Sequence, residues 1–370
     1  MKILYVITSL RLGGAERLVT DLSIGLSKEG HNVEVFVMDS TRTPLREELE
    51  KNGIKIYNGW QGYLNMWNPL CVLKLRSVIS KGNYDIIHSH NSAAQFLTIC
   101  CNKKNSVLVT TEHNTKNRRR FLPFFKRIDS LMYSRYDSII TVSKTTNDAL
   151  ITYLPEKMLA VKTHMIYNGI NISNFDYGKV TYFPGKREKT IIMVAGFRHQ
   201  KDHTTLIKAM SLLSDDYKLL LVGDGVTRKE TEQHVQQLGI SSRVTFLGFR
   251  KDVRNLLSES DIFVLSSNFE GCPISVIEAM ALGLPVIGSE VEGLSEIVAD
   301  TGLLFKAGDV KELADKIMMI TQNENLYREI SNKCKQKSHD FDITTTLINH
   351  YELYDSLIKE NVEKNILNED

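Results

Sequence analysis

Short, continuously apolar runs alternate along the chain with segments in which apolar residues recur every three or four positions. The run at 3–8 is followed by a glycine pair and by a segment that places Leu18, Leu22 and Leu26 on one face. Such runs are typical of strands buried on both faces of a parallel sheet, and such segments are typical of amphipathic helices. Further strands are expected at 33–38, 54–57, 86–88, 107–111, 139–142, 190–195, 219–222, 244–247, 262–265 and 285–287. The pattern therefore predicts an α/β protein.

The length of the chain and one segment with glycine and proline indicate two domains. The 370 residues are enough for two domains that each bury a core. We expect an N-terminal domain at 1–172, a linker at 173–188 and a C-terminal domain at 189–342. A last helix and a charged tail occupy 343–370, and we expect the tail to fray after residue 359.

The composition is that of a soluble globular protein, with 42% hydrophobic and 24% charged residues. A net charge of +2 points to no particular partner, and we expect no nucleic acid to bind. The five cysteines are odd in number and lack the spacing of a metal site, which is typical of a reduced cytosolic protein. No stretch approaches the roughly 20 apolar residues that span a bilayer, and the N-terminus lacks the features of a signal peptide. We therefore expect the protein in the cytoplasm.

The stretch 262–289 predicts a strand-helix-strand unit that could bind a phosphate. A loop with Glu270 follows the apolar run, Pro273 stands where a first helical turn tolerates proline, and Gly283 ends the helix. Amides at the helix start can hold an anion, and Glu278 in the second turn can accept hydrogen bonds from a diol such as a ribose. Glu270 can face the group beyond the phosphate. A surface ion pair at Glu278 and a solvated Glu270 fit the spacing equally well.

The sequence FEGCPISVIEAMALGLPVI, from 269 to 287, resembles the E-x7-E signature of retaining GT-B glycosyltransferases of family 4. The resemblance extends over almost the whole chain and includes bacterial transferases that build capsular, exopolysaccharide or lipopolysaccharide chains. It implies two Rossmann-like parallel-sheet domains that face a central cleft, with a C-terminal helix that crosses back to the first domain. The donor-binding residues that it implies in this stretch are Glu270, Gly271, Cys272, Pro273, Ile274, Ser275 and Glu278.

Two polar loops of the N-terminal domain match loops that the family uses for its substrates. The glycine pair lacks the G-x-G-x-x-G spacing of a nicotinamide or flavin site, but Gly13 and Gly14 resemble a G-G-A-E loop whose amides approach the donor diphosphate. His113, in T-E-H-N, matches a position whose imidazole contacts the transferred sugar. The cluster around His90 follows another expected strand and is expected to shape the acceptor site. A packing turn and structural histidines are the alternatives.

The C-terminal domain begins with a strand that is followed by two cations, Arg198 and Lys201, which can neutralise a diphosphate. Lys201 matches the phosphate-binding lysine of the family, but Gly196 stands where the family has an arginine, and Arg198 is the candidate replacement. Gly223 lies in a close-approach turn, and Arg250 lies in a loop that in relatives is near the nucleotide base. Solvated surface cations are the alternative for Arg198 and Lys201.

The segment 116–127, KNRRRFLPFFKR, is the one patch of strong local charge. Arg118, Arg119 and Arg120 precede a group of aromatic and aliphatic residues, and Lys126 and Arg127 follow it. This composition suits contact with an anionic bilayer or with a lipid-linked diphosphate. Peripheral attachment to the inner face of the plasma membrane is therefore expected. An ordinary segment with inward aromatics and solvated arginines fits as well.

The expected activity is retaining transfer of a sugar from a nucleoside diphosphate sugar to a hydroxyl of a growing, lipid-linked bacterial surface glycan. Glu270, His113, Lys201 and Arg198 are the expected catalytic residues. No metal and no cofactor are expected, because the one D-x-D, at 340–342, precedes a helix and follows no strand. Uridine is the base by family habit. The transferred sugar remains open, as does the choice between a polyprenyl-linked and a soluble acceptor.

Two other classes fit part of the pattern. Non-hydrolysing nucleotide-sugar epimerases share the two-domain architecture, and the missing arginine at Gly196 weakens the transferase assignment. A catalytically silent subunit that binds nucleotide is the second alternative. The presence of Glu270, Glu278, Lys201 and His113 together favours the transferase.

Overall fold

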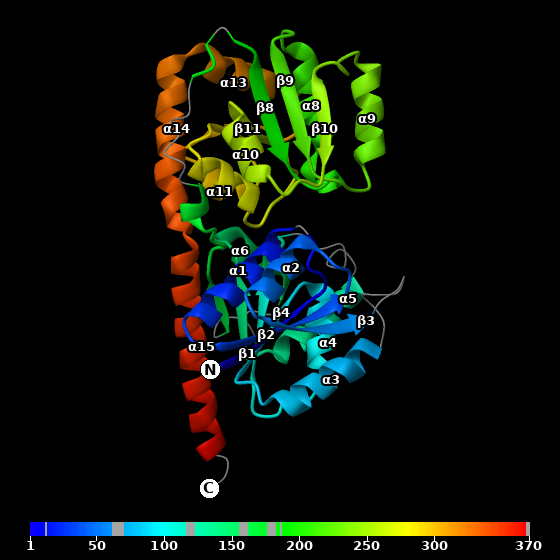
Figure 1. Cartoon of the computed structure of the whole chain (residues 1–370), viewed down its shortest axis with the longest axis vertical. Helices are drawn as coiled ribbons and strands as arrows, with labels where there is room; N and C mark the ends of the chain where they lie inside the picture. The colour runs from blue at the N-terminus through cyan, green and yellow to red at the C-terminus, as the bar shows by residue number, and fades with distance from the viewer. Residues whose placement is uncertain are drawn as a thin grey trace. The chain divides into compact units, whose positions relative to one another are not determined.

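The computed structural model describes residues 1–11, 13–60, 70–115, 123–154, 162–175, 183–185 and 187–367. The chain divides into two units, each with its own parallel sheet (Figure 1). Unit 1 comprises Met1–Gly169 and Ile343–Asp370, and unit 2 comprises Ile170–Asp342. Within the described ranges, no helix combines the length and the apolar character that crossing a membrane requires.

Unit 1 is built around a seven-stranded parallel sheet in the order β3-β2-β1-β4-β5-β6-β7. Its strands are β1 (Lys2–Ile7), β2 (Asn32–Asp39), β3 (Lys55–Trp60), β4 (Ile86–His90), β5 (Val107–Glu112), β6 (Ser138–Thr141) and β7 (Thr163–Met165). Its helices are α1 (Gly14–Lys28), α2 (Pro44–Lys51), α3 (Leu70–Gly82), α4 (Ser92–Ile99), α5 (Pro123–Ser134), α6 (Lys144–Tyr153) and α15 (Ile343–Leu367).

The alternation of side chains along β1 separates the two cores of unit 1. Ile3, Tyr5 and Ile7 point to the face that α1, α2 and α15 cover. Leu4 and Val6 point to the opposite face, where they pack with residues of α3, α4, α5 and α6. Because successive strand residues point to opposite faces, a strand that is apolar throughout must be covered on both sides.

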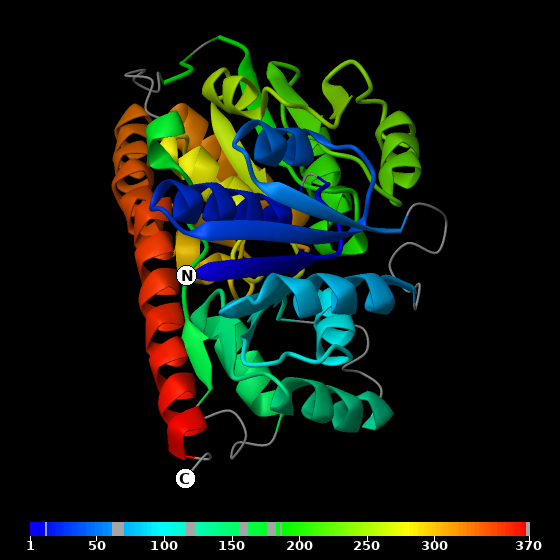
Figure 2. The ribbon, with the colours of Figure 1, turned by 60° about the horizontal axis from the view of Figure 1, so that its bottom comes forward.

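The last helix of the chain, α15, completes the core of unit 1. Ile343, Leu353 and Tyr354 are buried in the same core as β1. A Cβ atom at Gly25 of α1 would lie 2.5 Å from Cδ1 of Leu347, so the missing side chain permits the close approach of α1 and α15. Figure 2 shows the start of β1 beside α15, as does Figure 1.

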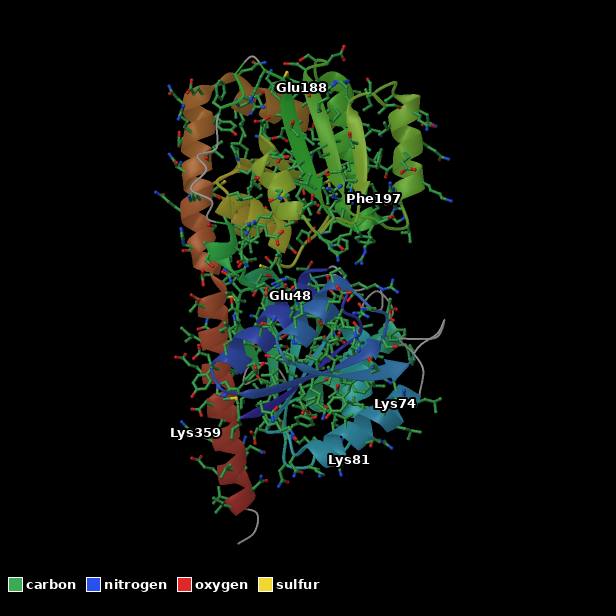
Figure 3. The ribbon with its side chains drawn as sticks, in the orientation of Figure 1. Glu48, Lys74, Lys81, Glu188, Phe197 and Lys359 are labelled. Carbon is green, nitrogen blue, oxygen red and sulfur yellow. The ribbon has the colours of Figure 1, made fainter. Side chains whose placement is uncertain are left out.

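α15 continues to Leu367, beyond the end expected near residue 359. On its exposed side, Lys359 pairs with Asp355 at 2.7 Å and Lys364 with Glu360 at 3.7 Å (Lys359 is labelled in Figure 3). Pairs of opposite charge four residues apart lie next to each other on a helix and favour it slightly. The charged residues after 359, which we expected in a frayed tail, therefore lie on the helix as far as Leu367.

Unit 2 contains a six-stranded parallel sheet in the order β10-β9-β8-β11-β12-β13. Its strands are β8 (Lys189–Val194), β9 (Tyr217–Val222), β10 (Val244–Gly248), β11 (Ile262–Leu265), β12 (Val286–Ser289) and β13 (Leu303–Phe305). Its α-helices are α8 (His203–Leu212), α9 (Arg228–Gln237), α10 (Val253–Ser258), α11 (Ile274–Ala281), α12 (Leu294–Val298), α13 (Val310–Gln322) and α14 (Glu324–Ser338). Its 3-10 helices are η2 (Ile172–Phe175), η3 (His199–Lys201) and η4 (His339–Phe341).

The segments that connect the units differ from the expected linker. The described residues of 173–188 belong to unit 2, and the first segment of unit 1 ends at Gly169 instead of residue 172. The amide of Ile170 donates a hydrogen bond to the carbonyl of Phe341 at 2.9 Å. The outgoing and returning segments are therefore joined to each other, and residues 170 to 342 form one unit.

Candidate active site

In each sheet the strand order reverses at one point, between β1 and β4 in unit 1 and between β8 and β11 in unit 2. Open α/β sheets bind ligands beyond the carboxyl ends of their strands at such a point. The predicted residues of unit 1, which we call the unit 1 site, are Gly13, Gly14, His90 and His113. Those of unit 2, which we call the unit 2 site, are Arg198, Lys201, Gly223, Arg250, Glu270, Gly271, Cys272, Pro273, Ile274, Ser275 and Glu278.

The two loops of the unit 2 site are held together by hydrogen bonds. After β8 the chain passes through η3, and after β11 it enters the loop of the E-x7-E sequence. The amide of Asn268 donates to the carbonyl of Gln200 at 2.7 Å, and Gln200 Nε2 donates to the carbonyl of Phe269 at 2.9 Å. Ser266 Oγ donates to the carbonyl of Asp202 at 2.9 Å. These bonds fix Lys201 in η3 next to Glu270.

Lys201 and Glu270 form an ion pair, with Nζ of Lys201 2.6 Å from Oε1 of Glu270. The lysine side chain is 19% exposed and the glutamate side chain 6%. Removing one partner of such a pair would leave a nearly buried charge uncompensated. A phosphate that approaches Lys201 therefore competes with a carboxylate that is already in place.

Two glycines allow the strand-end loops of unit 2 to approach one another. Gly223 has φ of 134°, and a Cβ atom there would overlap the carbonyl oxygen of Ala195. Gly293 has φ of 78°, and a Cβ atom there would overlap the carbonyl oxygen of Glu270. Both backbone conformations disfavour other residues. The support that the Gly293 turn gives to the Glu270 backbone is visible only in the structure.

Arg198 lies close to the place of the missing arginine. Phe197, labelled in Figure 3, is buried, whereas Arg198 is exposed at the end of unit 2 where β8 ends. A Cβ atom at Gly196 would lie 3.8 Å from Nε of Arg198 and 3.6 Å from the carbonyl oxygen of Asp224, which is ordinary contact. The head group of Arg198 therefore begins near the point from which a side chain at 196 would extend.

The start of α11 has the features of an anion site. Pro273 stands at the N-cap and provides no side-chain cap, and the first turn begins at Ile274. The amides of Ile274 and Ser275 lie where an α-helix offers no intrahelical acceptor. The positive end of the helix favours a negative group there. Glu278, one turn further on, is half-buried.

The loop after β10 contains Arg250 and an exposed aromatic ring. Arg250 Nε lies 2.7 Å from Oδ1 of Asp252, and the second nitrogen lies 2.5 Å from Oδ2. This pairing lowers the pKa of Asp252. Phe249 is 63% exposed, and Gly223 donates its amide to the carbonyl of Gly248 at 2.9 Å. The loop thus presents an apolar ring beside the Gly223 turn.

In the unit 1 site, Gly13 and Gly14 are exposed at the start of α1. Gly13 is extended, with φ of −162°, so its backbone conformation does not require glycine. A Cβ atom at Gly13 would instead overlap the carboxylate of Glu16. The helix start has no side-chain cap, so its amides are directed to the exposed loop.

His113 follows β5 and contacts His90 at the end of β4. Nε2 of His113 lies 3.0 Å from Nδ1 of His90. His113 is half-buried, and burial lowers its pKa to about 4. His90 has no exposed surface. The expected role of His90 in the acceptor site stays a prediction; in this structure the ring contacts Tyr5, His88 and His113.

The basic patch is described only in part. Arg118, Arg119 and Arg120 lie outside the described residues. In α5, Phe124 is 67% and Leu131 61% exposed, and Lys126 and Arg127 are exposed beside them. Phe124 therefore does not pack inward, although the rings of Phe124 and Phe125 contact each other with centroids 5.0 Å apart.

The sequence did not reveal the buried partners of the histidines. His88 Nδ1 lies 2.6 Å from the hydroxyl of Tyr354, and His88 Nε2 lies 2.7 Å from Oγ1 of Thr111. Tyr354 and His350 come from α15, far along the chain. The sequence signal that could have indicated this contact is the four-residue spacing of His350 and Tyr354, which places both side chains on one face of the helix.

Residues 12–174 match the family "Glycosyltransferase Family 4", and residues 181–337 match the family "Glycosyl transferases group 1". An uncharacterized glycosyltransferase of Methanocaldococcus jannaschii is 30% identical over 317 residues, which cover 78% of this chain and 79% of the relative. The chain belongs to the glycosyltransferases. It is an enzyme of the hexosyltransferase type.

Two further relatives of this glycosyltransferase have names that state the reaction they catalyse. N-acetyl-alpha-D-glucosaminyl L-malate synthase of Bacillus anthracis is 27% identical, with coverage of 92% of this chain and 93% of the relative. The GalNAc-alpha-(1->4)-GalNAc-alpha-(1->3)-diNAcBac-PP-undecaprenol alpha-1,4-N-acetyl-D-galactosaminyltransferase of Campylobacter jejuni is 24% identical, with coverage of 93% and 95%.

The fold of this glycosyltransferase has close neighbours among solved structures. HepE of Anabaena, solved in complex with UDP and glucose, superposes with a TM-score of 0.83 at 23% identity, over 96% of this chain and all of the neighbour. Together with the two parallel sheets, this likeness confirms the predicted GT-B fold class.

Proposed function

We propose that the enzyme transfers a sugar, with retention of configuration, from a UDP-sugar to a hydroxyl of a lipid-linked bacterial surface glycan of the capsular or lipopolysaccharide type. One observation carries the proposal. At the strand reversal of unit 2, two cations and an uncapped helix start lie at loops that also contain Glu270 and Glu278. This is the charge arrangement that a nucleoside diphosphate requires.

Lys201, Arg198 and the amides of Ile274 and Ser275 hold the diphosphate in this proposal. Fixed cations that stabilise a departing diphosphate can replace a metal ion, so we propose a metal-independent reaction. Lys201 exchanges Glu270 for a phosphate oxygen when the donor binds. The Glu270 carboxylate then turns to the hydroxyls of the sugar.

The transfer step follows a front-face path. The bond between the anomeric carbon and the phosphate oxygen breaks while the acceptor oxygen bonds to the same face of that carbon. The acceptor proton passes to the departing phosphate, which leaves as part of UDP. His113 binds the transferred sugar, and Glu278 binds the ribose.

A uracil base fits the loop of Phe249 and Arg250 in unit 2. The exposed Phe249 ring offers an apolar surface, and the preceding Gly248 is hydrogen-bonded to the Gly223 turn. The complex of Anabaena HepE with UDP and glucose makes UDP the first nucleotide to test.

Two observations support a lipid-linked acceptor: the exposed residues of α5 and the named substrate of one relative. Phe124 and Leu131 are exposed beside Lys126 and Arg127, which suits the surface of an anionic bilayer. The Campylobacter relative acts on an undecaprenol-linked saccharide, whereas the Bacillus relative is named for L-malate, a soluble acid. We favour the lipid-linked class because a soluble acceptor does not explain the exposed apolar residues of α5.

Calorimetry in EDTA with UDP, GDP, ADP and their sugars tests the donor site. We expect UDP and one UDP-sugar to bind, and Glu278→Ala and Arg198→Ala to weaken binding about tenfold or more. Arg328→Ala is the matched control, because Arg328 is an exposed arginine on α14 that pairs with Glu324. Unchanged binding in both site variants would refute the assignment.

A double variant that moves the arginine from position 198 to position 196 tests the role of Arg198 more sharply. In Gly196→Arg/Arg198→Ala, the cation returns to the position that the family uses, and a Cβ atom fits there in ordinary contact. We expect this double variant to recover most of the UDP affinity that Arg198→Ala loses. If Arg198→Ala loses affinity and the double variant recovers none of it, Arg198 does not replace the arginine.

Product analysis separates transfer from epimerisation. The donor that binds is incubated first without acceptor and then with undecaprenyl-diphosphate saccharides or small hydroxy acids. A transferase leaves the sugar configuration unchanged and releases UDP when the acceptor is added. Conversion of the donor to its epimer without an acceptor would identify an epimerase.

A further inference from the structure

A cluster of four histidines lies in unit 1 between the sheet and α15. His88 and His90 have no exposed surface, and His350 is 1% exposed. Ring centroids are 4.2 Å apart for His88 and His90, 5.3 Å for His90 and His113, and 6.0 Å for His88 and His350. Burial lowers the pKa of His113 and His350 to about 4 and that of His88 and His90 well below the ordinary value.

Each of these rings is therefore neutral at pH 7, and a neutral imidazole has one N–H donor and one acceptor nitrogen. The contact between Nδ1 of His90 and Nε2 of His113 can form in two ways. If His90 donates, the proton of His113 lies on Nδ1. If His113 donates, the proton of His90 lies on Nε2.

The surroundings of His90 favour the first arrangement. Nε2 of His90 is buried and has no hydrogen-bond partner in the part of the chain that the structure describes. A proton on Nε2 would be a buried donor without an acceptor, and orphaned N–H groups are rarer in proteins than incompletely satisfied acceptors. The arrangement in which His90 donates leaves only a lone pair at that position.

His350 is a second histidine of this cluster with a buried acceptor nitrogen. Nδ1 of His350 lies 2.8 Å from the carbonyl oxygen of Thr346, and a carbonyl can only accept, so the proton is on Nδ1. Nε2 of His350 is then an acceptor, and it is also buried without a partner among the described residues. Two histidines of one cluster thus have the same pattern.

We propose that His90 is a positioning residue whose Nδ1–H donates a hydrogen bond to Nε2 of His113 and thereby keeps the proton of His113 on Nδ1. His113 then presents a hydrogen-bond donor, not an acceptor, at its remaining ring nitrogen. A donor in this position pairs with an oxygen of the bound sugar. This last step rests on the proposed function, whereas the proton arrangement does not.

Nitrogen-15 NMR of the histidine side chains tests the proton arrangement in the ligand-free protein. His113→Gln assigns the His113 signals by their loss. We expect the wild-type ring to be protonated on Nδ1 at pH 7, and His90→Phe to abolish this preference. His90→Asn keeps an N–H donor close to the place of Nδ1, so we expect it to restore the Nδ1–H form of His113.

His350→Phe is the matched control, because His350 is buried in the same cluster but bonds to a carbonyl of its own helix. We expect it to leave the His113 signals unchanged. A His113 ring protonated on Nε2 in the wild type would overturn the proposal. The proposal would also fail if His90→Phe left the signals as they were, or if His350→Phe changed them as much.

Kinetics with the donor identified above form a second arm. We expect His90→Phe to lower kcat about tenfold with a smaller change in KM, and His90→Asn to recover part of the loss. If no transfer occurs in the wild type, the proposed function fails while the NMR result still decides the proton arrangement. If transfer occurs and His90→Phe leaves kcat unchanged, the catalytic consequence of the proton arrangement is refuted.

Discussion

The unit 1 site and the unit 2 site lie at equivalent points of two similar sheets, yet they differ in charge. The ends of β4 and β5 place two neutral histidines side by side, of which His90 is buried and His113 half-buried. The ends of β8 and β11 place a lysine against a glutamate, with an arginine exposed nearby. The same sheet topology therefore presents neutral hydrogen-bonding groups in unit 1 and charged side chains in unit 2. This difference agrees with the proposal that the first site contacts the sugar and the second the diphosphate.

The largest effect should come from Lys201, the charge that we propose binds the diphosphate. Replacing Lys201 with Met removes the cation at similar length and leaves the nearly buried Glu270 carboxylate unpaired. We expect kcat/KM to fall roughly 100-fold or more. Lys208→Met, at an exposed position of α8, is the control, and steady-state kinetics with the donor found by calorimetry is the measurement. If kcat/KM were the same for Lys201→Met and Lys208→Met, the charge of Lys201 would have no special role, and the contrast in charge between the two sites would have no functional meaning.

The next effect concerns the backbone support of the charged site. Gly293→Ala places a Cβ atom onto the carbonyl of Glu270 at a positive φ, so we expect a loss of about 2 kcal/mol or more in the free energy of unfolding. Gly308→Ala has a similar φ of 82° but meets no atom within 4 Å, so we expect only about 1 kcal/mol from backbone strain. Denaturant titration of both variants measures the difference. Similar losses would show that the contact with Glu270 does not matter.

The neutral site should make unit 1 the more acid-sensitive unit. The pKa of His113 and His350 is lowered from 6.5 to about 4 in the folded protein. The unfolded chain therefore binds protons first as the pH falls, and the stabilisation is complete above pH 6.5 and is lost between 6.5 and about 4. Unit 2 contributes His203, whose pKa is also lowered to about 4.

Hydrogen exchange of peptides from each unit at pH 7 and pH 5, corrected for intrinsic rates, measures this difference. We expect protection to fall more in unit 1 than in unit 2. His88 and His90 add to the effect in unit 1, and Glu112 beside His113 reduces it slightly because its charge favours the imidazolium. An equal loss in both units would mean that the histidine cluster is not a net acid-sensitive element.

The smallest effect should come from an ion pair of unit 2 with exposed partners. Arg250 and Asp252 have side chains that are 39% and 40% exposed. Water and salt screen such an exposed pair, so we expect Asp252→Asn to leave the free energy of unfolding almost unchanged. Denaturant titration with and without 0.5 M salt checks this. A larger loss would show that the charge of the unit 2 site is structural.

Much of the fold was accessible from the sequence, because the apolar runs of parallel strands are continuous and their helices are periodic. The expected strands at 3–8, 107–111 and 262–265 correspond to β1, β5 and β11. β7 at Thr163–Met165 was not expected, because a strand of three residues with two exposed side chains has no apolar run.

The candidate site was predictable where it depends on local sequence and not where it depends on distant contacts. The loops of Glu270 and Lys201 follow strands that the apolar pattern locates, so their shared edge could be inferred. The ion pair between them joins residues 69 positions apart, and no spacing rule predicts it. The burial of His90 depends equally on packing that residues near it in sequence do not reveal.

The contribution of α15 to the core of unit 1 has a consequence for biosynthesis. Tyr354 lies beside Tyr5, with the two hydroxyls 3.2 Å apart across a sequence separation of 349 residues. On the ribosome, the first 169 residues emerge long before α15, which covers one face of their sheet together with α1 and α2. Unit 2, continuous from Ile170 to Asp342, can fold first. One apolar face of the first sheet therefore stays incompletely covered until the residues of α15 have been translated.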